Sequence, residues 1–250
     1  MLRFFRQIRK TLMEQNKIRT YIFYAVGEIA LVMIGILLAL QVNNWNEGRK
    51  INREEQRILI SLKLDIDQAI TDMESLVERT ESNVKTLEIL LTDGDEKEQF
   101  LNNPKIDSLM FRPLWSSAVG IPIIQTYSDL KNTGELSLIQ SPMIREALVE
   151  IENGFIDLKN QQGDLLTVQQ TRVDEIALNY IDFSTVIQSS VIPIITRGEK
   201  NDYRKLLDNR LVKNTFVAKL SLLRGGLRFQ VEMLEASRKV SSLIGNEIKD

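Results

Sequence analysis

The apolar segment at residues 21–42 constrains this chain more than any other feature. It reads YIFYAVGEIALVMIGILLALQV and contains a single charged residue. About 20 apolar residues, each rising 1.5 Å in a helix, span the hydrocarbon core of a bilayer. Tyr21 and Tyr24 at one end and Trp45 beyond the other fit the aromatic belts of membrane interfaces. The segment is long for a signal peptide and lacks a small-x-small cleavage site, so we predict a permanent transmembrane helix at residues 21–43.

The charges around this segment predict its orientation. Residues 1–46 carry a net charge of +4 and the remainder −6, which gives −2 in total. Because positive flanks stay in the cytoplasm, we expect a cytoplasmic N-terminus and a periplasmic body, anchored in a bacterial inner membrane. Residues 1–20 place basic and apolar side chains at helical spacing, which predicts an amphipathic segment in the headgroup plane of the lipid bilayer. The alternative is a basic flank that only sets topology.

Glu28 is the charged residue inside the apolar segment. An intramembrane carboxyl group is costly and usually faces a partner. Gly35 and Ala39 fall on the same helical face, with Ala25 at its border, and small residues at this spacing permit close contact between helices. We therefore predict a helix–helix interface at Ala25, Glu28, Gly35 and Ala39, through which the chain binds a protein partner or a second copy. The alternative is a protonated or snorkelling Glu28 without a partner.

Two blocks of the sequence resemble a known family. The first comprises residues 27–29 (GEI), 34–41 (IGILLALQ) and 43–47 (NNWNE), and the second is residues 127–139 (YSDLKNTGELSLI). Together they are similar to an uncharacterised family of bacterial single-pass membrane proteins, common in Bacteroidetes, that carry a domain of unknown function. The resemblance implies a single membrane span and places Glu28 in a family pattern. It implies no activity.

The sequence beyond Trp45 favours long helices. The whole chain has only 5 Pro and 12 Gly residues, and a low count of helix breakers favours helices over strands. From Ile51 to Leu91, apolar residues recur at steps of three and four, which is typical of a helix that packs along one face. Similar patterns predict helices at residues 142–181, beginning at Ser141-Pro142, and at residues 203–248.

These patterns predict an all-α fold, in which the N-terminal transmembrane helix is followed by an elongated antiparallel helical bundle with an irregular helical cap. The bundle is expected to occupy residues 47–250. Its first long helix would leave the membrane, the second return and the third leave again. Residues 95–141, divided by Pro and Gly and including a helix that ends before Gly134, would form the distal cap. Residues 183–196 would then lie near the bilayer.

The composition excludes several classes of function. The chain has no Cys and no His, which excludes disulfides, thiolate nucleophiles, Cys/His zinc sites and imidazole catalysis. An acidic body is unsuited to binding nucleic acid. Ser128 and Lys131 have the spacing of an acyl-transfer motif, but the supporting motifs of such enzymes are missing. We therefore predict no enzymatic activity, no catalytic residue, no metal site and no cofactor.

The strongest candidates for a binding surface in the soluble domain are Phe111, Arg112 and Trp115, with Tyr127 as a further member. Trp and Arg are typical of binding hot spots, so these residues are a candidate surface for a partner or ligand. The alternative is that the aromatic rings only plug the end of the bundle. We expect a non-enzymatic, membrane-anchored interaction or scaffold protein. The alternative function is an extracytoplasmic ligand-sensing domain that signals sideways to a membrane partner, because a cytoplasmic segment of about 20 residues is too short for an output domain.

Overall fold

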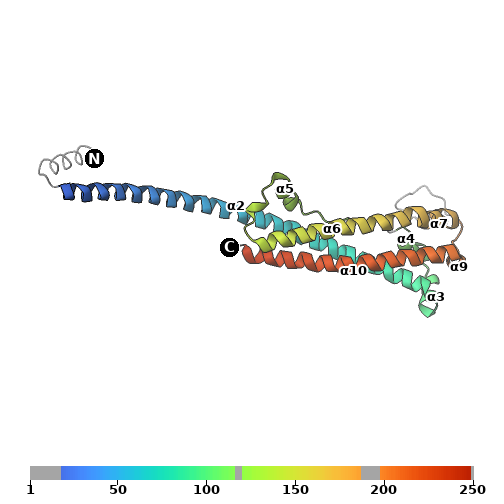
Figure 1. Cartoon of the computed structure of the whole chain (residues 1–250). Helices are drawn as coiled ribbons and strands as arrows, with labels where there is room; N and C mark the ends of the chain where they lie inside the picture. Colours follow the sequence, from blue (N-terminus) through green and yellow to red (C-terminus); the bar gives the residue numbers. More distant parts are fainter. Residues whose placement is uncertain (1–17, 116–119, 187–197, 249–250) are drawn as a thin grey trace. The chain divides into compact units, whose positions relative to one another are not determined.

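The computed structural model describes residues 18–115, 120–186 and 198–248, and every regular element in these ranges is a helix (Figure 1). The all-α prediction is therefore confirmed. The chain divides into two compact units, Met1–Gln56 and Arg57–Asp250. The predicted amphipathic segment at residues 1–20 lies almost wholly outside the described residues.

Helix α2, Ile18–Leu91, is 74 residues long and runs through both units. Within the first unit, residues 21–42 of α2 are apolar except for a few side chains such as Glu28, and every residue from 31 to 40 is exposed. Among the described helices, α2 is the one with the length and composition to cross a membrane. In the second unit its character changes, because one face carries the predicted apolar stripe and is buried from Ile58 to Leu90.

Two more long helices pack with the second half of α2. Helix α6, Pro142–Val168, begins after Ser141 as predicted, and a π-helical turn, η2, Gln169–Val173, joins it to α7, Asp174–Tyr180. Helix α10, Arg210–Glu247, follows the short α9, Tyr203–Asp208. The side chains of Asp202 and Asn209 accept hydrogen bonds from backbone N–H groups at the starts of α9 and α10. These caps satisfy donors that a helix start leaves unpaired.

Two clusters of buried residues fix the directions of the long helices. The first cluster joins residues 58–76 of α2 to residues 144–158 of α6 and 234–244 of α10. The second joins residues 84–90 of α2 to Leu165, η2, α7 and residues 212–223 of α10. Helix α6 therefore runs in the same direction as α2, and α10 runs antiparallel to both (Figure 1). The expectation that the second long helix returns along the first is wrong.

The segment expected to form one cap is divided between the two ends of the second unit. Helices α3, Asp95–Leu101, and α4, Ile106–Trp115, contribute to the second cluster. Helix α5, Gln125–Thr133, and the 3-10 turn η1, Leu136–Leu138, pack on the first. Helix α5 ends at Gly134 in the left-handed conformation, with φ of 77°, as predicted. The chain thus returns to the Ile58 end before α6 begins, because Ile124, Tyr127 and Leu130 are buried there.

Because α6 runs parallel to α2, the connection between the second and third long helices also lies at a different end from the one expected. Helix α8, Phe183–Val186, follows α7, and Val186 belongs to the second cluster with the end of α2. The described part of residues 183–196 therefore lies at the Leu90 end of the second unit, opposite to the expected end. Residues 187–197 lie outside the described residues.

Candidate functional site

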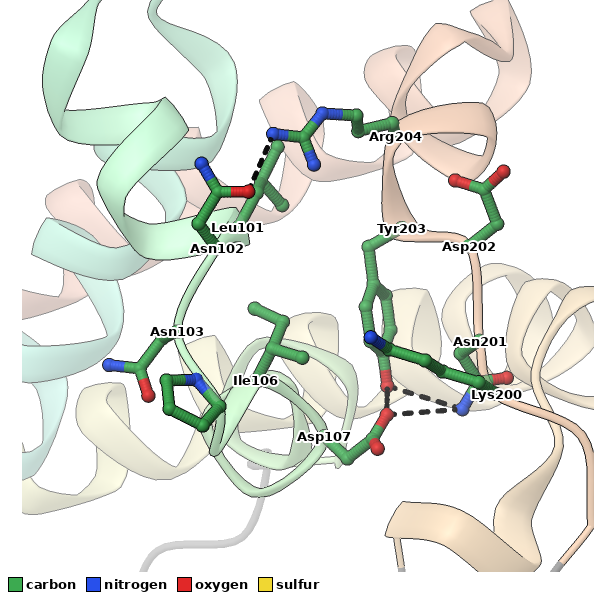
Figure 2. Close-up of a pocket in the computed structure, with 11 residues that line it drawn as sticks. Leu101, Asn102, Asn103, Ile106, Asp107, Lys200, Asn201, Asp202, Tyr203 and Arg204 are labelled. Atoms are coloured by element: carbon green, nitrogen blue, oxygen red, sulfur yellow. Dashed lines mark hydrogen bonds between the residues drawn. The ribbon is translucent and has the colours of Figure 1, made fainter.

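A polar cavity of about 420 Å³ lies at the Leu90 end of the second unit (Figure 2). One wall is the connection between α3 and α4, residues 101–107, and the other is residues 200–204, which lead into α9. The two walls are about 100 residues apart in sequence. Its size falls in the usual range for small-molecule sites, so this cavity is the candidate functional site.

A hydrogen bond between Tyr203 and Asp107 joins the two walls. The hydroxyl group of Tyr203 donates to Oδ1 of Asp107 at 2.6 Å. Nδ2 of Asn201 lies 3.3 Å from both of these oxygen atoms, so the three side chains converge (Figure 2). Tyr203 is only 4% exposed. Burial, and then the carboxylate of Asp107, raise the pKa of Tyr203 above its usual range, which keeps its hydroxyl group protonated as a donor.

Asn201 also holds the second wall against the residues around α8. Its Nδ2 donates to Oγ1 of Thr185 at 2.6 Å, and its Oδ1 accepts from the backbone N–H of Asp182 at 2.7 Å. The carboxylate of Asp182 accepts from the hydroxyl and backbone N–H of Ser184, and these bonds lower the pKa of Asp182. Asn201 therefore links α8 to the wall of the cavity through hydrogen bonds.

Gly198 shows how closely the chain before α9 approaches Asp182 and Ser184. The backbone N–H of Gly198 donates to Oγ of Ser184 at 2.6 Å. A Cβ atom added at Gly198 would lie 1.7 Å from a carboxylate oxygen of Asp182. A residue with a side chain at this position would have to displace that carboxylate, so glycine is required for the packing seen here.

Both signs of charge line the cavity. Lys200 and Arg204 come from the α9 side, and the guanidinium group of Arg204 reaches the opposite wall, where it donates to Asn102 at 3.2 Å (Figure 2). The same group pairs with Glu98 at 2.6 Å. Asp107 and Asp202 provide carboxylates. Such a lining suits a small polar molecule. Within the described ranges, no group of three or more acidic side chains is arranged to hold a metal ion.

The structure brings together only some of the residues predicted to form a binding surface outside the apolar segment. Phe111 and Trp115 lie on α4 with ring centroids 5.8 Å apart, and Trp115 contacts Phe183 at 4.2 Å. Phe111 is 47% exposed, whereas Trp115 is partly buried in the second cluster. Tyr127 lies on α5 in the first cluster, where its hydroxyl group donates to Glu152. The side chain of Arg112 lies outside the described part of the structure.

The predicted membrane stripe lies on α2 in the first unit. Gly35 and Ala39 are exposed, and Ala25 and Glu28 are partly exposed. A Cβ atom added at Gly35 would meet no atom within 4 Å. Gly35 is therefore not required by contacts within the described part of this chain.

Several polar residues that the structure singles out could not be identified from local sequence patterns. Asp107, Asn201 and Tyr203 meet only through tertiary structure. Lys219 is 1% exposed in the second cluster, and its amine donates to Gln169. One available signal was Gln169, which, like Gln162, interrupts the apolar stripe on the second long helix.

Comparison with curated proteins and with solved structures gives no match. A family model matches residues 28–112, which run from Glu28 in the apolar segment into α4. The second block of the resemblance, residues 127–139, lies outside this match. Over residues 28–112, the chain is similar to DUF6090, a family of unknown function.

Proposed function

We propose that this protein is a single-pass membrane protein whose helical bundle acts as a non-enzymatic interaction or scaffold component. The observation that carries the proposal is the exposure of every residue from 31 to 40 on an apolar helix. Uncovered apolar surface of this extent is unfavourable in water, whereas a bilayer covers it at no such cost. The absence of Cys and His from the sequence supports a role without thiol or imidazole chemistry.

The proposed location is a bacterial inner membrane, with the N-terminus in the cytoplasm and the bundle in the periplasm. The basic residues before the apolar segment support this orientation, since positive flanks are retained in the cytoplasm. The aromatic ring of Trp45, with the Arg49 guanidinium group 5.0 Å from its centroid, supports an interface at the other end of the segment.

Membrane fractionation followed by protease treatment tests this proposal. The full chain is expected to stay in the membrane pellet after alkaline carbonate extraction, which releases peripheral proteins. Protease added to spheroplasts should then digest the bundle and spare a short N-terminal fragment. Recovery of the chain in the carbonate supernatant would contradict the anchor, and protection of the whole chain in intact spheroplasts would contradict the orientation.

The proposed route to partners is the stripe of Ala25, Glu28, Gly35 and Ala39. Small residues let a second helix approach closely, and a carboxyl group on the same face can form a hydrogen bond across the interface. The occupant would be a second copy of this helix or the helix of another membrane protein.

A ligand-sensing domain is the second candidate function, and the cavity between the α3–α4 connection and α9 favours it. Charged and amide groups from both walls converge there around a volume of about 420 Å³. Native mass spectrometry of the detergent-solubilised full chain distinguishes the two candidates. A stoichiometric protein in the complex favours the interaction role. A bound small molecule that is lost in an Arg204→Ala variant favours sensing.

A further inference from the structure

Lys219 is the most unusual residue in the core of the second unit. It lies on α10 between Phe216 and Leu223, and only 1% of its surface is exposed. Lysine is almost never fully buried unless its amine has partners. Here Nζ donates to Oε1 of Gln169 at 2.7 Å. The buried amine therefore has a hydrogen-bond partner within the core.

Gln169 connects Lys219 to two other elements. Its side-chain amide donates to the backbone oxygen of Leu114, near the end of α4, and to Oδ1 of Asp174 at 2.7 Å, at the start of α7. Gln169 is itself 3% exposed. The network therefore joins α10, α4 and α7 through one glutamine side chain, and the carboxylate of Asp174 interacts electrostatically with the amine of Lys219.

Gln169 is also the first residue of the π-helical turn η2. The backbone N–H of Asp174 donates to the oxygen of Gln169, five residues earlier, where an α-helix would use four. Such a turn accommodates one extra residue. Leu158 and Leu165 are seven residues apart, whereas Leu165 and Val173, which flank the π-helical turn, are eight apart. The extra residue keeps the buried face of α7 aligned with that of α6.

We propose that the Lys219–Gln169 contact is a latch that holds this π-helical turn, and that its release lets the turn revert to α-helix and rotates α7 out of its present register. A one-residue change of register turns a helix by about 100° and moves it by ~1.5 Å. A turn of that size would take Val173 and Ile176 out of the core, where both are fully buried.

The proposed rotation would reach the polar cavity through a short path. Ile181 and Asp182 follow directly after α7, and the backbone N–H of Asp182 donates to Asn201. Asn201 in turn contacts Asp107 and Tyr203 in the cavity wall. The latch is thus positioned to couple the core of the bundle to the shape of the cavity, as a conformational device built into the fold.

Trp115 is a natural reporter of this device. Its ring contacts Phe183, which is the first residue of α8 after α7, at a centroid distance of 4.2 Å. The chain has two Trp residues, so Trp45→Phe leaves Trp115 as the only one. The experiment uses the full chain carrying Trp45→Phe in detergent and measures the emission maximum. Lys219→Met removes the amine but keeps a flexible, apolar chain of similar length.

The latch predicts a red shift of Trp115 emission in Lys219→Met, because loss of the Phe183 contact exposes the indole to water. Lys239→Met, at an exposed position of the same helix, should leave the emission unchanged. Deletion of the exposed Thr171 removes the extra residue and restores the seven-residue spacing. Added to Lys219→Met, this deletion should return the emission to that of the parent.

Deletion of Asn160, an exposed residue in the regular part of α6, is the matched control and should not restore the emission. If Lys219→Met does not fold, recovery of helical circular dichroism and parental emission by the Thr171 deletion supports the latch. Unchanged emission in Lys219→Met would overturn the proposal. Failure of the Thr171 deletion to restore the signal, or equal restoration by the Asn160 deletion, would overturn it too.

Discussion

The hydroxyl oxygen of Tyr203 lies 2.6 Å from Oδ1 of Asp107, and this contact joins residues 96 positions apart in sequence. It connects the start of α9 to the first turn of α4 across the polar cavity. A buried phenol that donates to a carboxylate is a charge-assisted hydrogen bond, which is stronger than one between neutral groups. The contact is therefore expected to contribute to the stability of this end of the bundle.

Tyr203→Phe tests that contribution. The change removes one oxygen atom and leaves Asp107 without its shortest donor, so we expect a loss of about 1.5–3 kcal/mol in unfolding free energy. At ~2–4 °C per kcal/mol for a domain of this size, thermal unfolding of the full chain in detergent should show the loss. Tyr180→Phe is the control, because Tyr180 is 51% exposed and its only described hydrogen bond, from Asn209, is 3.4 Å long. Equal melting temperatures for the two variants would contradict the assignment.

Lys219 should make the stability of the bundle depend on pH. Burial lowers the pKa of Lys219 from 10.5 to about 7, and the carboxylate of Asp174 opposes this only in part. Between those values the unfolded chain binds more protons than the folded chain, so the unfolding free energy rises with pH. The slope from this group approaches ~1.4 kcal/mol per pH unit.

Melting temperatures of the parent and of Lys219→Met at pH 7.5, 8.5 and 9.5 isolate this effect. The parent should gain stability relative to the variant as the pH rises. The range stops below pH 10 because of Tyr203, whose pKa is raised in the folded state. Its contribution to the unfolding free energy falls once tyrosine in the unfolded chain begins to ionise. Parallel curves for the two proteins would show that Lys219 has an ordinary pKa in the folded state.

Two Gly→Ala changes are expected to have opposite signs. Gly134 ends α5 with φ of 77°, and a Cβ atom there would meet no neighbour within 4 Å. Gly134→Ala should therefore destabilise the protein by about 1–2 kcal/mol through backbone strain alone. Gly163 is an exposed residue inside α6 with equally open space, so Gly163→Ala should stabilise it by about 0.4–1 kcal/mol. Thermal unfolding measures both, and the same sign for both changes would refute the backbone argument.

The stripe of Ala25, Glu28, Gly35 and Ala39, which we propose as a helix–helix interface, makes a prediction about self-association. Gly35→Leu adds bulk where a second helix would approach, whereas Glu28→Gln keeps a group that can form hydrogen bonds. In a transmembrane self-association assay, we expect the parent to associate most strongly, Glu28→Gln less and Gly35→Leu least. Because a side chain at Gly35 meets nothing in the described part of the chain, a loss would report on association. If Gly35→Leu associates as well as the parent, the stripe does not bind a second copy.

The sequence by itself determined the helices and many of their ends. The apolar spacing of α2 predicted its buried positions from Ile58 to Leu87, and Ser141-Pro142 and Gly134 marked a helix start and a helix end. These features are predictable because helical periodicity and capping depend on residues within one or two turns of each other. The exposed apolar stretch of α2 is predictable for the same reason, because it is a run of neighbouring residues.

Tertiary structure alone decided the direction of α6, the partner of Lys219 and the polar cavity. An apolar stripe has the same period whichever way its helix runs, so it could not reveal that α6 is parallel to α2. Residues 111, 115 and 127 are close in sequence, yet Tyr127 packs in a different cluster because the chain returns to the Ile58 end between them. In a sequence, a lysine within an apolar face is interpreted as an exposed residue. It can be buried when a distant residue supplies a hydrogen-bond acceptor for its amine. Here that acceptor is Gln169, 50 positions away, and no local pattern encodes a contact of that range.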